Sequence, residues 1–479
     1  MRINNLRRKT VYLFIFLTFM LFSVVSVSAD TSVKVLRIYN WEDYISDGKD
    51  DEGNVTEEIA NVIDEFKVYY YEKHNESIEV EYVTYATNEV MLSTLETGKS
   101  QYDLVCPSDY VIQKMIKKDM LEKVSKPIPN YEKYASPYIK DLFSEYGWDE
   151  YGVCYMWGTM GFLYDPEYVD EEDVSTWEVM WNPEYQYKVT TKDSMRDTYV
   201  AGVAYAYLDE LKALNADYNE GKVTTEFYNQ KITEILNRCD EDTISKVGEA
   251  LNAMKLNIFG FEVDSGKTDI TTGKININFA WSGDAVYAMD IAESDADKYL
   301  KYKVPEEGSN IWFDAWVMPK GANVELAQEF MDFICLPEIA VKNMEKIGYT
   351  SAITGDEVYE MILDWYSDDE GEYEVDLSYY FGDTLSKYES AIVKTSEIGR
   401  QFTAQYPTKD IVDRCAIMQD FGDQNDEVME MWQDFKSESV YYAGLFILIA
   451  LVLCYVAYVI YNSRQKRVRN NRLKSNNKN

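Results

Sequence analysis

Ile38-Tyr-Asn-Trp-Glu-Asp-Tyr44 is the segment that says most about how this chain of 479 residues is organised. Val33–Tyr39 predicts a short strand, which runs directly into a turn that holds two aromatic rings and two carboxylates. The same mixture recurs at Ser108-Asp-Tyr110, Asp193-Ser-Met-Arg-Asp197 and Trp312-Phe-Asp314. Aromatic faces beside carboxylates suit an elongated cation with an apolar stem, because the carboxylates pair its charged ends and the rings take its methylenes.

The composition is that of a folded, acidic and tyrosine-rich chain. Aromatic residues make up 15% of it, with 41 Tyr, and the formal net charge is −37. A chain of 479 residues is long enough for two globular lobes. Basic residues gather at the ends, four within residues 1–10 and seven within residues 462–479, so the part between them is more acidic than the whole. Such a surface disfavours nucleic acid as a partner and favours a cation.

Two residue types exclude several kinds of chemistry. His74 is the only histidine, which disfavours Ser-His-Asp and Cys-His catalytic arrangements and most transition-metal sites. The six cysteines are scattered and contain no Cys-x-x-Cys, so neither a zinc site nor a disulfide framework is indicated. We therefore expect no cofactor, no metal and no enzymatic activity.

Two apolar stretches bracket the acidic body. Residues 1–29 hold a basic start, an apolar run and small residues at Val27-Ser-Ala29, and are interpreted as a signal peptide or an uncleaved signal anchor. Residues 441–461 carry no charge over 21 residues, which is enough for a transmembrane helix. The basic tail at 462–479 should stay in the cytoplasm. We therefore expect a protein of the cell membrane, with its main body extracytoplasmic, in the periplasm or on the cell surface.

The hydrophobic pattern alternates between strands and helices. Strands are predicted at Val33–Tyr39, Ile78–Tyr82, Tyr102–Pro107 and Ile275–Trp281. Helices are predicted from a cap at Thr87 or Asn88 to Gly98, from Asp109 onward, over Val324–Ile334 after an Asn323 cap, and over Glu338–Ile347 before Gly348. This alternation implies βαβ units and a parallel sheet.

Aromatic residues follow three of the predicted strands. Trp41, Ser108-Asp-Tyr110 and Trp281 each fall at or just beyond the carboxyl end of a strand. Ligands of open α/β sheets bind in the crevice outside those ends. A single Trp or Tyr is more often part of the core, but three at strand ends beside carboxylates favour a binding site.

A series of short motifs resembles one family. The motifs are Tyr39-Asn-Trp-Glu-Asp-Tyr44, Thr84-Tyr-Ala-Thr-Asn-Glu89, Tyr102-Asp-Leu-Val-Cys-Pro-Ser-Asp-Tyr110, Trp157-Gly158, Trp181-Asn-Pro-Glu-Tyr185, Asp193-Ser-Met-Arg-Asp197, Trp281-Ser-Gly-Asp284, Trp312-Phe-Asp314 and Ile347-Gly-Tyr349. Each is weak alone, but their order and spacing are specific. From about Val33 to Lys436 the chain resembles the spermidine/putrescine-binding proteins of bacterial ABC transporters.

The resemblance implies an α/β fold of the type II periplasmic-binding-protein kind, in which two lobes joined by crossing strands enclose a ligand cleft. Lobe 1 would comprise residues 33–158 and 313–365, and lobe 2 residues 159–312 and 366–438. The hinge would pass near Trp157-Gly158 and Trp312-Phe313. The implied function is capture of a polyamine and its delivery to the permease subunits of an ABC transporter, which work with an ATPase. Extra length at 46–54 and 366–410, and the C-terminal span, depart from the family.

The resemblance also implies a set of ligand contacts. The aromatic walls would be Trp41, Tyr44, Trp281 and Trp312, with Tyr349 as a further contact; the ammonium-binding carboxylates would be Asp193, Asp197 and Asp314; polar contacts would come from Ser108 and Tyr110, an acid from Asp43, and a late glutamine from Gln419. Trp312 and Asp314 lie two residues apart, so in an extended segment both side chains point to one face. Arg196 would repel a cation, so we expect it to turn away or to orient a carboxylate.

Two other functions use the same residue types. A glycoside hydrolase also combines two carboxylates with Trp platforms, but nothing in the sequence marks an acid with a raised pKa. The same fold could instead bind a different small cationic solute, such as another diamine, an amino-acid derivative or a thiamine-like cation.

Overall fold

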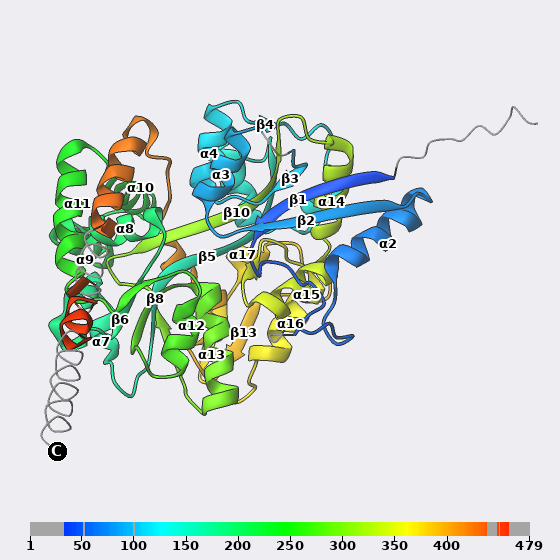
Figure 1. Cartoon of the computed structure of the whole chain (residues 1–479). Helices are drawn as coiled ribbons and strands as arrows, with labels where there is room; N and C mark the ends of the chain where they lie inside the picture. Colours follow the sequence, from blue (N-terminus) through cyan, green and yellow to red (C-terminus); the bar gives the residue numbers. More distant parts are fainter. Residues whose placement is uncertain (1–32, 51–52, 99–100, 438–447, 450, 459–479) are drawn as a thin grey trace, which may run out of the picture.

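A long mixed sheet runs through the middle of the body, with helices packed around it (Figure 1). The computed structural model describes residues 33–50, 53–98, 101–437, 448–449 and 451–458. The strands are β1 (Lys34–Trp41), β2 (Ile78–Tyr85), β3 (Leu104–Val105), β4 (Leu121–Glu122), β5 (Gly152–Tyr164), β6 (Val189–Lys192), β7 (Gly260–Glu262), β8 (Ile277–Trp281), β9 (Lys301–Lys303), β10 (Ser309–Pro319), β11 (Thr350–Ser351), β12 (Tyr373–Asp376), β13 (Ile392–Thr395) and β14 (Cys415–Ile417).

Helices occur along the whole described part of the chain. They are α2 (Val62–His74), α3 (Asn88–Glu96), α4 (Asp109–Lys117), α5 (Pro129–Tyr134), α6 (Pro137–Glu145), α7 (Glu171–Val174), α8 (Met195–Ala206), α9 (Leu208–Asn219), α10 (Thr225–Leu236), α11 (Glu241–Met254), α12 (Ser265–Thr271), α13 (Ser282–Ala296), α14 (Val324–Ile334), α15 (Pro337–Ile347), α16 (Asp356–Tyr366), α17 (Ser378–Phe381), α18 (Gln401–Gln405) and α19 (Lys409–Asp413), with short 3₁₀ turns η1 (Trp177–Trp181), η2 (Pro183–Tyr185) and η3 (Gly422–Gln424). Residues 425–437 form one more helix.

The strand order along the main sheet is β2-β1-β3-β10-β5-β8-β6-β7 in the described part of the chain. β1 pairs in parallel with β2 and β3, and β6 pairs in parallel with β7 and β8. Between these parallel parts, β5 and β10 run antiparallel to each other. The prediction of a parallel sheet is therefore wrong in the middle of the sheet. The reason is that these two strands run directly from one parallel part of the sheet to the other, without the crossover helix that connects parallel strands in a βαβ unit.

Strands β5 and β10 connect the two parallel parts. They are 13 and 11 residues long, and each of their residues is buried. The register places Trp312 opposite Gly158 and Phe313 opposite Trp157, which are the two pairs predicted to lie near the hinge. The register shifts between Asp314 and Ala315, a β-bulge in a strand that also carries two predicted ligand contacts.

Several local predictions are confirmed. Thr87 caps α3, with its side chain accepting a hydrogen bond from the backbone of Val90, and Asn323 caps α14 in the same way. α15 ends at Gly348, whose φ of 74° lies in the left-handed region that glycine adopts without a Cβ clash. Four predicted strands are present as β1, β2, β3 and β8, each within three residues of its predicted bounds, which were Val33–Tyr39, Ile78–Tyr82, Tyr102–Pro107 and Ile275–Trp281.

The extra length at 366–410 builds its own structure. It forms the antiparallel hairpin of β12 and β13, in which Tyr373 lies opposite Thr395, together with α17 and α18. Val375 and Val393 of the hairpin are buried, as are Tyr380 and Phe381 of α17. The insertion therefore adds to the hydrophobic core.

The predicted membrane segments lie largely outside the described residues. Residues 1–29 and 462–479 are among those not described, and of residues 441–461 only 448–449 and 451–458 are described, as helix. Among the described residues, no helix has the length and apolar character required to cross a membrane.

Close packing of the crossing strands makes Gly158 a sensitive position. A Cβ added there would lie 2.4 Å from Ser282 Oγ and 2.7 Å from Cζ2 of Trp312. We expect Gly158→Ala to lower the free energy of unfolding by about 1–3 kcal/mol, because either β10 or α13 must move. Gly260→Ala is the matched control, since an added Cβ in β7 would meet nothing within 4 Å. Equal denaturation midpoints for the two variants would contradict this prediction.

Candidate ligand-binding site

The carboxylate of Asp314 lies at the centre of the predicted site. Its side chain is buried in β10, and Tyr44 Oη donates a hydrogen bond of 2.8 Å to its Oδ2. Its backbone forms an isolated bridge with Ser108, the residue that precedes α4. Tyr44 comes from the turn after β1, so three distant parts of the sequence meet at one carboxylate.

Three aromatic rings, those of Tyr44, Trp312 and Tyr349, pack together at this site, and Tyr349 contacts the other two. Its ring packs edge-to-face against Tyr44 and Trp312, with centroid distances of 5.2 and 5.6 Å. Its hydroxyl donates to Oδ1 of Asp284 at 2.9 Å. A Cβ on Gly283 would lie 2.3 Å from the Tyr349 ring, so glycine at the start of α13 allows the close approach. Tyr349 thus links Trp312 to Tyr44, which in turn hydrogen-bonds Asp314.

Burial raises the pKa of two nearby acids. Loss of hydration raises the pKa of Asp314 to about 7, although the Ser108 and Tyr44 hydroxyls favour its ionised form and limit the rise. Burial also raises the pKa of Asp197, a residue of α8 whose charge acts on Asp314. One carboxylate oxygen of each, Oδ1 in both cases, has no hydrogen-bond partner among the described residues.

A third buried acid, Asp109, was not among the predicted contacts. Burial raises its pKa well above the usual range, and its Oδ2 lacks a hydrogen-bond partner in the described part of the chain. It lies in the quoted motif Ser108-Asp-Tyr110, at the first position of α4. The neighbouring predicted contacts, Ser108 and Tyr110, are joined by Asn88, whose Nδ2 donates to both hydroxyl oxygens at 3.0 Å.

Three more of the predicted contacts are Trp41, Asp43 and Gln419. Trp41 packs against Tyr85 at 4.9 Å and donates through Nε1 to the carbonyl of Cys106 at 2.8 Å. Asp43 is exposed, in a turn where its φ is 47°. Gln419 is half-buried and uses its backbone N–H to reach Oδ1 of Asn237 at 2.9 Å. None of these contacts tests a role in ligand binding, which stays a prediction.

Asp193 is paired within the chain. Its Oδ1 forms an ion pair with Lys436, in the helix at 425–437. Its backbone N–H donates to the carbonyl of Glu262 at 2.7 Å. Its role as a ligand contact stays a prediction.

Arg196 turns away from the aromatic rings around Asp314. Its Nη2 donates to Oδ1 of Asn237, and its guanidinium lies 4.7 Å from the ring centroid of Phe421. Its charge stabilises the ionised forms of both Asp109 and Asp197. The sequence left two alternatives for Arg196, and the structure shows features of both.

Lys192 was not predicted, and it is the most deeply buried cation near the site. Its side chain is 0% exposed and forms ion pairs with Glu262 at 2.8 Å and Asp284 at 3.1 Å. Its ammonium lies 4.0 Å from the ring centroid of Trp281. Burial lowers the pKa of Lys192, but the two carboxylates outweigh this effect and raise it. Both partners of the ion pair between Lys192 and Asp284 adjoin or belong to quoted motifs, which was the available sequence signal. Lys192 directly precedes the motif that begins at Asp193, and Asp284 is the last residue of Trp281-Ser-Gly-Asp284.

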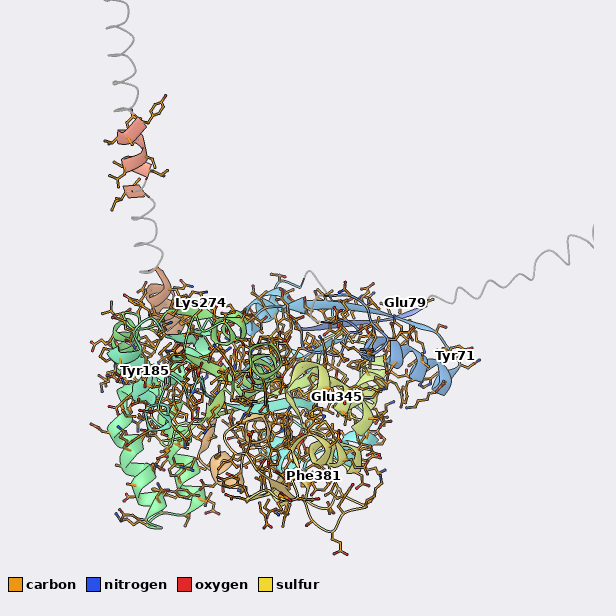
Figure 2. All side chains as sticks on the ribbon, turned by 90° about the horizontal axis from the view of Figure 1, so that it is seen from below. Tyr71, Glu79, Tyr185, Lys274, Glu345 and Phe381 are labelled. Atoms are coloured by element: carbon orange, nitrogen blue, oxygen red, sulfur yellow. The ribbon has the colours of Figure 1, made fainter. Side chains whose placement is uncertain are left out.

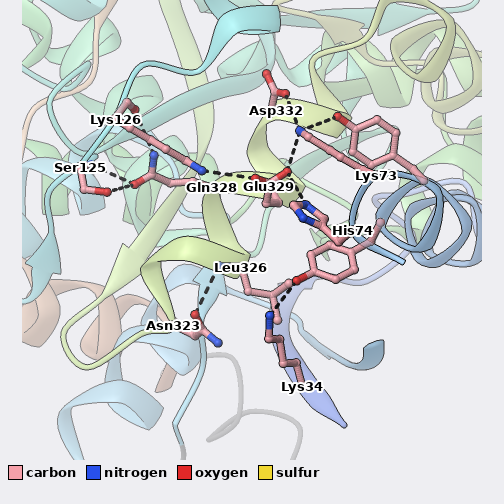
Figure 3. Close-up of polar contacts among 12 residues, drawn as sticks. Lys34, Lys73, His74, Ser125, Lys126, Asn323, Leu326, Gln328, Glu329 and Asp332 are labelled. Carbon is pink, nitrogen blue, oxygen red and sulfur yellow. Dashed lines mark hydrogen bonds and ion pairs between the residues drawn. The ribbon is translucent and has the colours of Figure 1, made fainter. Parts of the chain in front are cut away.

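The only histidine lies in a separate network, shown in Figure 3. His74 Nε2 lies 3.5 Å from Oε2 of Glu329, which also pairs with Lys73 at 2.8 Å and Lys126 at 3.3 Å. Burial opposes ionisation of Glu329, but the lysines outweigh it and hold its pKa below the usual range. Across the described residues there is no group of three or more His, Cys, Asp or Glu side chains suited to a metal ion.

Comparison with known proteins identifies the family. Residues 61–370 match the family model described as bacterial extracellular solute-binding protein. The chain belongs to the bacterial extracellular solute-binding proteins. Among curated members of this kind, the spermidine/putrescine-binding periplasmic protein of Salmonella typhimurium is 25% identical over 317 residues, covering 66% of this chain and 76% of that protein.

Two further comparisons extend the family match. The putrescine-binding periplasmic protein SpuD of Pseudomonas aeruginosa is 26% identical over 338 residues, covering 68% of this chain and 80% of that protein. A solved structure described as a spermidine/putrescine ABC transporter from Listeria monocytogenes superposes with a TM-score of 0.59 at 25% identity, over 84% of this chain and 99% of that one. The α/β periplasmic-binding-protein fold predicted from the sequence is therefore confirmed for this solute-binding protein.

The Lys192 network generates a prediction about stability. Lys192→Met keeps much of the side-chain volume but leaves Glu262 and Asp284 with less positive charge in a buried position. We expect the free energy of unfolding to fall by about 3–5 kcal/mol, as when one partner of a buried ion pair is removed. Lys212→Met is the matched control, because its pair with Glu178 is exposed and should contribute about 0–1 kcal/mol. A similar loss in both variants, measured by urea denaturation, would show that burial of Lys192 has no special effect.

Proposed function

We propose that this protein binds a polyamine, such as spermidine or putrescine, outside the cytoplasmic membrane and delivers it to the permease of an ABC transporter with its ATPase. The observation that carries the proposal is the pair of buried acids Asp314 and Asp197, each with a carboxylate oxygen that no described group hydrogen-bonds. Buried carboxylates without a partner are unfavourable in a folded protein. A ligand that brings ammonium groups would supply the missing hydrogen bonds and charge.

The rings around Asp314 supply the second part of the argument. Trp312, Tyr349 and Tyr44 are in contact beside the carboxylate, and Trp rings attract cations by about 0.5–2 kcal/mol each, more when water is excluded. The methylene groups of a polyamine would bury apolar area against the same rings. The printed names of the relatives, which are spermidine/putrescine-binding and putrescine-binding proteins, support the same ligand class.

We assign roles to the twelve predicted contacts on this basis. The rings of Trp41, Tyr44, Trp281, Trp312 and Tyr349 would enclose the methylenes, the carboxylates of Asp43, Asp193, Asp197 and Asp314 would pair the ammonium groups, and Ser108, Tyr110 and Gln419 would make polar contacts. The contacts around Asp314 support the assignment most strongly. Asp193 would first have to release Lys436.

We also propose the two-lobe division at 33–158 with 313–365, and 159–312 with 366–438, with the ligand cleft between the lobes. The crossing strands β5 and β10 support it, because they join the two parallel parts of the sheet. Under this division the hydrogen bond from Tyr349 to Asp284 joins lobe 1 to lobe 2. A ligand that touches Asp314 and Asp197 would contact both lobes and favour their closure.

One observation favours a second candidate. A carboxylic acid with a pKa of about 7, as at Asp314, is also what a general acid of a glycoside hydrolase has. Membership of a solute-binding family weighs against hydrolysis. Incubation with oligosaccharides, followed by chromatography of the products, tests this alternative. Calorimetry with diamines, amino-acid derivatives and thiamine-like cations tests other solutes on the same fold.

The sharpest test of the polyamine proposal is the substitution Asp314→Asn. It keeps the size of the side chain and removes its charge, so one ammonium group loses its partner. We expect a loss of about 2–5 kcal/mol in spermidine binding, whereas Trp312→Leu should lose about 0.5–2 kcal/mol. Calorimetry at fixed salt measures both.

The control for these two variants is Asp165→Asn. Asp165 is also buried, but it directly follows the C-terminal end of β5. Asp314 pairs with β5 near the other end of that strand. Its replacement should leave spermidine affinity unchanged. If Asp314→Asn binds as tightly as Asp165→Asn, the charge-pair explanation of this site is wrong.

The raised pKa of Asp314 predicts a pH dependence. Without ligand the carboxyl is mostly protonated below its pKa of about 7, and a bound cation favours the ionised form. Binding at pH 6 should therefore release close to one proton, and affinity should rise as pH increases from about 5 to 8. Calorimetry in buffers of different ionisation enthalpy measures the proton release. The Asp314→Asn variant should lose the proton release that comes from Asp314. If the number of protons released is unchanged in this variant, the proton comes from another group.

We propose that residues 441–461 anchor the body to the cell membrane as a transmembrane helix. Their 21 residues without charge, followed by seven basic residues, support this arrangement. Truncation after Ser439 should move the protein from the membrane fraction to the soluble fraction and keep spermidine binding. If the truncated protein stays with the membrane, residues 1–29 must be the main anchor.

A further inference from the structure

An exposed apolar patch lies on the end of the body next to the helix at 425–437. Tyr187, Leu256 and Phe259 form it, with exposed fractions of 59%, 71% and 41%. They are held together by the backbone, since Tyr187 N–H donates to the carbonyl of Asn257 and Phe259 N–H to that of Val189, both at 2.6 Å. Large apolar side chains exposed together are typical of an interaction surface.

Lysines surround this patch of Tyr187, Leu256 and Phe259. The ammonium of Lys274 lies 4.7 Å from the ring centroid of Phe259, and Lys188 reaches the carbonyl of Lys274 at 3.1 Å. Lys255 directly precedes Leu256 in the chain. One acid, Asp269, pairs with Lys274 at 2.9 Å. Three lysines around exposed aromatic and aliphatic side chains are unusual on a chain whose net charge is −37.

The patch is tied to the C-terminal end of the body. Lys255 Nζ donates to the carbonyl of Phe435, and Phe435 packs against Phe261 at a centroid distance of 5.2 Å. In Figure 2, Lys274 lies on the edge of the body from which the helix at 425–437 leaves. Ser437 is the last described residue of that helix, and the apolar run at 441–461 begins four positions later in the sequence.

This short connection limits how far the patch can stand from a membrane. Four extended residues span at most about 14 Å. If residues 441–461 enter a bilayer, the end of the body that carries the patch must therefore lie within reach of the lipid headgroups. Tyr is enriched at the boundary between water and lipid, Phe and Leu side chains can insert at that boundary, and lysines are attracted to anionic headgroups.

We infer that the patch of Tyr187, Leu256 and Phe259 rests on the headgroup layer of the membrane and fixes the orientation of this end of the body. The inference depends on the proposed anchor at 441–461. It assigns a lipid surface, not a protein, as the occupant of the patch. The other half of the body, which carries α3, would then stand away from the membrane and be free to move during closure.

Photo-crosslinking of the full chain tests this inference. A benzoylphenylalanine replaces Leu256 in one variant, Val90 of α3 in a second and Val456 in a third, all at exposed positions. Each variant is placed in vesicles that mix phosphatidylethanolamine and phosphatidylglycerol, illuminated, and analysed by mass spectrometry for lipid adducts. We expect adducts at 256 and 456 and at least tenfold less at 90.

The outcomes separate the patch from the anchor. Adducts at 456 alone would keep the anchor and overturn the lipid contact of the patch. No adduct at either position would overturn both. Equal adducts at 90 and 256 would show unoriented contact and also overturn the inference. In native membranes that hold the permease, a protein adduct at 256 in place of lipid would assign the patch to a protein partner and overturn it as well.

Discussion

Strands β5 and β10 run antiparallel through the middle of the sheet, and burial of every residue in both leaves little freedom in their register. That register decides where the site can form. It places Trp312 opposite a glycine and directs Asp314 toward Tyr44 and Ser108. A slip by one residue would turn both side chains to the other face of the sheet. The binding chemistry therefore depends on the pairing of two strands that themselves have little polar character.

A carboxylate in such a position is energetically unfavourable without a cation. Asp314, Asp197 and Asp109 all have raised pKa values because of burial, whereas Asp284 has a lowered pKa because Lys267 and Lys192 outweigh its burial. The two groups of acids thus differ in whether a cation of the chain outweighs burial, because Arg196 acts on Asp109 and Asp197 without doing so. Under the proposed function, the ligand would bring the missing charge to the first group, whereas Lys192 and Lys267 already pair Asp284.

Much of the fold was predictable because its signals are local. The caps at Thr87 and Asn323 and the stop at Gly348 depend on a few neighbouring residues, and they lie where the sequence places them. Contacts of the structure also link five of the predicted site residues, which are Tyr44, Ser108, Trp312, Asp314 and Tyr349. Pairings between distant segments were not predictable. Nothing local shows that Asp193 pairs with Lys436, 243 residues away, or that Lys192 faces Trp281.

Lys192 is chemically an alkylammonium ion tethered to the wall of the site. A tethered group has an effective concentration far above that of a free amine, so a simple monoamine cannot displace it. The face of Trp281 that Lys192 covers is therefore closed to ligands, and any guest must use what remains. The ammonium group of Lys192 thus belongs to the same chemical class as the proposed ligand, but it is covalently part of the protein. If Trp281 lines the proposed site, Lys192 would limit the size and shape of the ligand on that side.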